Sequence, residues 1–181
     1  MDNERSRVLG EIARYQPVPW ESIPDLGLYM DQVITFITRA YEPLYGESTK
    51  SYLSAPMINN YVKNKLIPRP SGKKYSRTQI AMLIMIVSLK RVYMMEDIRA
   101  MISVTDEADV QRLYAQFCAR QQEAIAQMNT SASDVSPAMD CAIFASAYRA
   151  GCEALLLAQA LGEEEMKEEV PGETQEDTTA S

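Results

Sequence analysis

The chain has 181 residues, of which 46% are hydrophobic and only 7 are glycine. This length suits one domain with an accessory segment, and the apolar share excludes a chain that is disordered throughout. The sequence contains no histidine, which excludes His-based catalytic triads and His metal sites.

The net charge of −7 conceals a strong segregation of charge along the chain. Between Ser48 and Met95 the sequence has nine cationic residues and no acidic one, so this segment carries +9 and the remainder −16. A basic segment in an otherwise acidic chain is typical of a protein that binds an anionic partner. A solvated basic face without a partner is the alternative interpretation.

The N-terminal region predicts a short helix from Arg5 to Arg14 and then an arm. Three prolines between Tyr15 and Pro24 prevent the helix from continuing. We expect this arm to lie on the protein surface, anchored by Trp20, with a disordered leader as the alternative. Apolar residues then recur at helical spacing from Leu28 to Tyr41, and Pro43 with Gly46 is expected to end that helix.

Ser54 is predicted to cap a short helix that has Pro56 in its first turn and ends before Ile67-Pro68. The proline-rich basic stretch from Pro68 to Tyr75 predicts a tight turn, and two very short strands are expected to flank Gly72.

Ser76 and Gln79 have the spacing of a capping box and open a long helix that is apolar over most of its surface. We expect this helix to form the centre of the domain. Two further helices are predicted, from Glu96 to Met101 and from Glu107 to Met128.

The pair Ser136-Pro137 opens a final helix that is predicted to end at Leu161, with Gly162 directly after it. Only three charges lie within this helix, so it must be covered on more than one side, and we expect part of it to meet a second subunit. Glu163 to Ser181 is predicted to be a disordered acidic tail. The tail either solubilises the protein or competes with DNA for the basic segment.

Several of these stretches resemble the DNA-binding domain of MerR-type transcription regulators. They are SAPMINNY from Ser54 to Tyr61, Leu66-Ile67-Pro68, Lys74-Tyr75-Ser76 and MEDIR from Met95 to Arg99. LYMDQV from Leu28 and MINNYVK from Met57 are also similar to an uncharacterised bacterial family, catalogued as a domain of unknown function related to MerR.

The resemblance spans about residues 20–103 and implies a mainly α fold there, namely a winged helix-turn-helix with a tiny β wing. The two helices predicted after it are expected to form a C-terminal helical hairpin. The expected divisions are an N-terminal arm over residues 1–27, the winged domain over 28–103, a C-terminal helical region over 104–162 and the acidic tail over 163–181.

The expected function is that of a DNA-binding transcription regulator that meets double-stranded DNA through a short recognition helix and a basic wing. Asn59 and Asn60 can read adenine edges, Asn64 can contact a base or a phosphate, and Tyr75 packs the wing or stacks. The cations that can meet phosphates are Lys63, Lys65, Arg69, Lys73, Lys74 and Arg77.

Other expectations concern location and partners. The N-terminus has no signal-peptide pattern, no uninterrupted apolar run reaches the about 18 residues of a membrane span, and the three cysteines lack metal-ligand spacing. We therefore expect a cytoplasmic protein that is not an enzyme, uses no metal or cofactor, has no membrane partner and forms a homodimer through its C-terminal helices.

Two alternative functions remain. Asn59, Asn60 and Lys65 replace the Arg, aromatic residue and Gly that are usual in the MerR recognition helix, which favours a protein-interaction adaptor that kept the fold without sequence-specific DNA binding. A sensor with a small-ligand pocket in the C-terminal helices is the weaker alternative.

Overall fold

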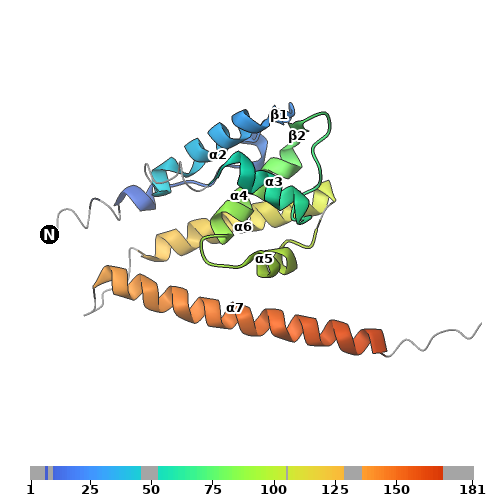
Figure 1. The fold of residues 1–181 in the computed structure, drawn as a ribbon. Helices are drawn as coiled ribbons and strands as arrows, with labels where there is room; N and C mark the ends of the chain where they lie inside the picture. Colours follow the sequence, from blue (N-terminus) through green and yellow to red (C-terminus); the bar gives the residue numbers. More distant parts are fainter. Residues whose placement is uncertain (1–6, 8–9, 46–52, 105, 129–135, 169–181) are drawn as a thin grey trace, which may run out of the picture. The chain divides into compact units, whose positions relative to one another are not determined.

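The computed structural model describes residues 7, 10–45, 53–104, 106–128 and 136–168. The chain divides into two compact units, Met1–Asp134 and Val135–Ser181. The structure is mainly helical, as predicted, with a sheet of two short strands (Figure 1). In chain order the elements are η1 (Trp20–Ser22), β1 (Leu28–Tyr29), α2 (Met30–Tyr45), α3 (Ala55–Lys63), β2 (Lys74–Tyr75), α4 (Arg77–Leu89), α5 (Met95–Met101), α6 (Glu107–Met128) and α7 (Pro137–Glu168).

Helix α4 is the centre of the first unit, as its apolar sequence predicts. Its predicted capping box is present, because the Gln79 N–H donates to the Ser76 hydroxyl (3.4 Å) and the Ser76 N–H donates to the Gln79 side-chain oxygen (2.8 Å). Every residue from Gln79 to Val87 is buried. A helix buried over its whole circumference needs neighbours on several sides.

Side chains of helices α2 and α6 both form hydrogen bonds with α4. The Tyr41 hydroxyl of α2 donates to the Ile84 carbonyl (2.8 Å), and the Gln121 amide of α6 donates to the Ser88 hydroxyl (3.2 Å). The sequence-based boundary after residue 103 separates α6 from this core and groups it with α7 in a hairpin. The structure places α6 in the first unit and α7 in the second.

The N-terminal arm lies against α6 and is anchored by Trp20, as predicted. Trp20 and Ile23 are buried, and the Tyr114 hydroxyl of α6 donates to the Val18 carbonyl (2.7 Å). Residues 10–13 before the arm are helical, while part of the predicted helix from Arg5 lies outside the described residues.

Strands β1 and β2 pair antiparallel, with Leu28 opposite Tyr75 and Tyr29 opposite Lys74. The prediction that Leu28 begins a helix was therefore wrong, because α2 starts only at Met30. The two strands predicted around Gly72 are confirmed only in part: β2 is present but has β1 as its strand partner, and on the other side of Gly72 Ser71 forms an isolated antiparallel bridge with Lys74. Gly27 permits this pairing, because an added Cβ would come within 2.9 Å of the Lys74 Cβ.

Helix α2 continues through Pro43 to Tyr45, whereas the sequence predicts that Pro43 ends it. A proline in the last turn removes one backbone hydrogen bond, which is a limited loss. Ring contacts hold this turn: Tyr45 stacks on Tyr41 with centroids 5.5 Å apart, and the Arg91 guanidinium lies 4.1 Å from the Tyr45 centroid.

Helix α7 begins at Pro137, as predicted, but continues past Gly162 to Glu168. The glutamates and lysine after Gly162 favour helix, and a glycine inside a helix costs only about 1 kcal/mol. The remainder of the predicted acidic tail, residues 169–181, lies outside the described residues.

Among the described residues, one segment is long and apolar enough to cross a membrane by length and composition: Ala138–Gly162 of α7. Its charged residues are Asp140, Arg149 and Glu153. A charged side chain at the centre of a bilayer costs about 2.5–3.5 kcal/mol, and both Arg149 and Glu153 lie near the middle of this segment. These two side chains bond to each other along the helix.

Candidate nucleic-acid interface

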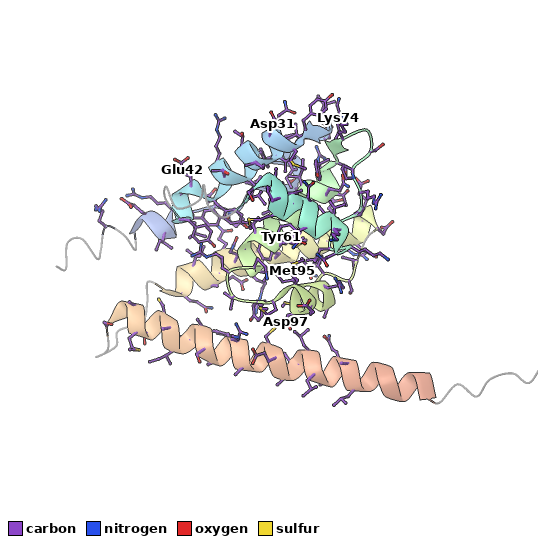
Figure 2. The ribbon with its side chains drawn as sticks, in the orientation of Figure 1. Asp31, Glu42, Tyr61, Lys74, Met95 and Asp97 are labelled. Atoms are coloured by element: carbon purple, nitrogen blue, oxygen red, sulfur yellow. The ribbon has the colours of Figure 1, made fainter. Side chains whose placement is uncertain are left out.

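Helix α3 turns one face to the core and the other to solvent. Ile58 and Tyr61 are buried, whereas Asn59, Asn60 and Lys63 are exposed. The helical spacing of the apolar residues predicts this division. Tyr61 of α3 is labelled in Figure 2. The outer face of α3 is therefore available to a partner.

The three asparagines on this helix differ in what they already bind. The Asn64 amide donates to both the Asn60 carbonyl (2.9 Å) and the Asn60 side-chain oxygen (2.8 Å). The Asn60 amide makes a weak contact of 3.6 Å with the Met95 sulfur. The Asn59 side chain has no hydrogen-bond partner among the described residues. Only Asn59 can therefore meet a base edge without first breaking a bond within the protein.

The C-terminal end of α3 is a Schellman turn. The Leu66 N–H donates to the Tyr61 carbonyl (2.9 Å) and the Lys65 N–H donates to the Val62 carbonyl (3.1 Å). Lys65 has a φ of 57°, the left-handed conformation that usually selects glycine. The turn ends the helix before Ile67-Pro68, as predicted, and leaves the Lys65 side chain exposed.

The basic turn before β2 has two consecutive residues with positive φ, Gly72 at 56° and Lys73 at 66°. The Lys74 N–H donates to the Ser71 carbonyl (2.9 Å), so Ser71 to Lys74 form a type I′ turn. Lys73 and Lys74 are both exposed, and the Lys74 ammonium lies 5.2 Å from the Tyr29 ring centroid. The turn therefore presents two adjacent cations to solvent.

Two predicted site residues have structural roles instead. Tyr75 is only 2% exposed, so its ring packs in the core and is unavailable for stacking on a base. The Arg77 guanidinium donates to the Ile23 carbonyl (2.8 Å) and lies 3.7 Å from the Asp25 carboxylate. Arg77 therefore ties α4 to the N-terminal arm, a contact that local sequence patterns cannot reveal.

A basic cleft of about 560 Å³ lies between the end of α3, the following turn and α5. Its floor is apolar, with Leu66, Met82 and Ile102 among its residues. The cations on its lining are Lys63, Lys65, Arg69 and Arg99, and none of the described residues that line it is a carboxylate.

Arg99 was not among the predicted site residues. It donates to the Asn64 carbonyl (2.7 Å) and so ties α5 to the end of α3. Its sequence signal, a cation in the last turn of a short helix, indicates only a favourable dipole interaction.

A second hollow, of about 450 Å³, lies between α3, the start of α2 and the basic turn before β2. Asn59 and Lys73 line it together with Tyr29 and Asp31. Figure 2 shows Asp31 and Lys74 at the end of the unit where β1 and β2 pair. Asn59 thus lies close to the basic turn, so one partner can reach both.

The cysteines form no metal site in the described part of the chain, where no group of three or more His, Cys, Asp or Glu residues could hold a metal ion. Cys118, Cys141 and Cys152 have free thiols. Burial raises the pKa of the Cys118 thiol, which keeps it protonated and weakly nucleophilic at neutral pH.

One family model matches this chain, over residues 18–117, which is more than half of its length. It describes a domain of unknown function, DUF1836. Neither the curated proteins nor the solved structures contain a match. The matched segment includes the N-terminal arm from residue 18 onward, the strand pair, α3 and the first half of α6. The chain therefore belongs to the DUF1836 family.

Proposed function

We propose that this protein is a cytoplasmic DNA-binding transcription regulator that lays α3 and the Ser71–Lys74 turn against double-stranded DNA. The observation that carries the proposal is the exposed cationic surface formed by Lys63, Lys65, Arg69, Lys73 and Lys74. No acidic residue interrupts the sequence between Ser48 and Met95. Duplex DNA is a dense line of negative charge, and such a surface complements it.

The arrangement of elements supports a winged helix-turn-helix of the MerR-like kind. A short helix, α3, precedes a basic turn, and the strand after that turn pairs with β1. In such folds the recognition helix lies in the major groove while neighbouring elements contact the backbone. On this reading α3 is the recognition helix and the Ser71–Lys74 turn is the wing.

The chemistry of this surface favours phosphate contacts over extensive base readout. Five exposed lysine and arginine side chains can each meet a phosphate, whereas among Asn59, Asn60 and Asn64 only Asn59 has a side-chain amide with no competing partner in the described residues. An asparagine can bind adenine by two hydrogen bonds and discriminate against the wrong base by about 1–3 kcal/mol. We therefore propose strong backbone binding with a sequence preference carried mainly by Asn59.

The test is the affinity for duplex DNA across 50–200 mM salt, measured by fluorescence anisotropy. Five phosphate contacts predict a slope of log affinity against log salt of about −4.5 for each protomer. The double substitution Lys73→Glu with Lys74→Glu removes two of those contacts and should weaken the slope by about 1.8.

The matched control is Arg14→Glu with Arg39→Glu, which makes the same change of charge at two exposed arginines outside the surface. It should leave the slope almost unchanged. Equal effects of the two double variants, or no detectable binding at 50 mM salt, would count against the proposal.

The alternative function is a protein-interaction adaptor that keeps this fold without sequence-specific DNA binding. The bonds between Asn60 and Asn64 favour it, because they withdraw two of the three asparagines from base readout. Under this alternative, Lys73→Glu with Lys74→Glu leaves the binding of the protein partner intact.

A further inference from the structure

Helix α7 has two different faces, although it is apolar over most of its length. Arg149 and Glu153 bond to each other along the helix, with 2.8 Å between the guanidinium and the carboxylate. Residues two positions apart in a helix point in nearly opposite directions. Gly151, midway between these two charges, therefore marks the centre of the face turned away from them.

The face centred on Gly151, called here the Gly151 face, has the same residue spacing on both sides of Gly151. Starting from Asp140, successive steps of four, three and four residues reach Gly151, and the same steps lead from Gly151 to Gly162. An eleven-residue repeat keeps its positions on one side of a nearly straight helix. The face consists of Asp140, Phe144, Ala147, Gly151, Leu155, Ala158 and Gly162.

We propose that two copies of this chain pair antiparallel through the Gly151 face of α7, with a two-fold axis at Gly151. Phe144 then lies level with the partner's Ala158, and Ala147 lies level with the partner's Leu155. Each of these layers combines one large and one small side chain, as close packing between helices requires. Gly151 meets the partner's Gly151, where the absence of side chains lets the two helices approach closely.

A parallel pair in register would pack poorly through the same face. It would set Phe144 against the partner's Phe144 and Ala147 against the partner's Ala147, so overfilled and empty layers would alternate.

A second copy suits this face better than other coverings. α7 exposes seven large hydrophobic side chains, and two of them, Phe144 and Leu155, which are 52% and 69% exposed, lie on the Gly151 face. In the described part of the first unit such residues are confined to two short segments, Leu26–Tyr29 and Val92–Met94. The face from Asp140 to Gly162 is about 33 Å long, which a second α7 matches along its whole length.

The first experiment compares the full chain with two variants by sedimentation equilibrium. Ala147→Glu buries a charge in the proposed interface twice, once from each copy, and should raise the dimer dissociation constant at least tenfold. Ala142→Glu makes the same change on the opposite face and should leave the dissociation constant unchanged. A monomeric wild-type protein, or equal effects of both variants, would overturn the proposal.

The second experiment tests the direction of pairing by disulfide formation in a background in which Cys118, Cys141 and Cys152 are replaced by serine. Chains with Phe144→Cys and chains with Ala158→Cys should crosslink only when they are mixed. Crosslinking of Phe144→Cys chains with themselves would indicate a parallel pair and overturn the proposal.

Flotation with phosphatidylcholine vesicles separates self-association from membrane insertion. The dimer should remain with the protein fraction, because the Gly151 face is already covered. Binding to the vesicles that Ala147→Glu abolishes and Ala142→Glu does not would show that lipid covers this face and would overturn the proposal. Pairing through α7 does not depend on DNA binding by α3. A negative result in the salt series would therefore leave the dimer standing, and a monomeric protein would leave DNA binding standing.

Discussion

At the scale of single residues, buried tyrosine hydroxyls connect segments of the first unit that lie far apart in the sequence. Tyr41 bonds to the Ile84 carbonyl, Tyr114 bonds to the Val18 carbonyl, and Tyr15 lies 3.4 Å from the Gln121 side-chain oxygen. Their burial is consistent with the apolar pattern of the sequence, but the acceptors are not predictable from it. Each acceptor belongs to a distant segment, so no local spacing identifies it.

The Tyr114 bond to the Val18 carbonyl offers a direct test of this role. Tyr114→Phe keeps the ring and removes the donor, so it should lower the free energy of unfolding by about 0.5–1.5 kcal/mol. Urea denaturation measures the change. Tyr148→Phe is the control, since Tyr148 is 71% exposed, and a comparable loss from both variants would contradict the assignment.

At the scale of elements, the sequence predicts features set by neighbouring residues better than features set by distant ones. The capping box of α4 depends on Ser76 and Gln79, three residues apart, and it is confirmed. The pairing of β1 with β2 joins segments on either side of α2 and α3, so Leu28 was wrongly assigned to a helix. In the candidate site, the exposed Asn59 and Lys63 follow from helical spacing, whereas the bond between Arg99 and the Asn64 carbonyl depends on tertiary packing.

The end of α3 yields a prediction that separates stability from DNA binding. Lys65 has the left-handed backbone conformation, which glycine adopts without the steric cost of a Cβ. Lys65→Gly should therefore leave the free energy of unfolding unchanged or raise it by up to about 1 kcal/mol. The same change removes one proposed phosphate contact and should weaken the salt slope by about 0.9.

The control for this prediction is Lys63→Gly, in the last turn of α3. It removes one cation as well, but it should lower the free energy of unfolding by about 0.5–1 kcal/mol, because glycine disfavours the helical conformation. Thermal or urea denaturation alongside anisotropy measures both quantities. A Lys65→Gly protein that is as destabilised as Lys63→Gly would contradict the role assigned to the turn.

At the scale of the whole molecule, the buried tyrosines link stability to alkaline pH. Burial raises the pKa of Tyr15, Tyr41 and Tyr114 above the ordinary value of 10.0. Above pH 10 the unfolded chain loses phenolic protons that the native protein retains, so the free energy of unfolding falls as pH rises. Below pH 10 both states keep these protons, and this contribution to stability is fully present.

The expected loss is up to about 1.4 kcal/mol per pH unit for each of these tyrosines. Urea denaturation at half-unit steps from pH 8 to pH 11 measures it. Tyr15→Phe removes one of the titrating groups and should make the fall less steep. A decline of the same steepness in the wild-type protein and in Tyr15→Phe would contradict the contribution of Tyr15.

The burial of α4 on every side has a consequence for how the protein is made. Ile84 and Ser88 of α4 contact segments that precede and follow it in the chain, and the later of these, α6, ends at Met128. During synthesis the first unit cannot close around α4 until α6 has left the ribosome. A chain cut at residue 103, where the sequence alone places the boundary, would leave one side of its central helix open to water and to other nascent chains.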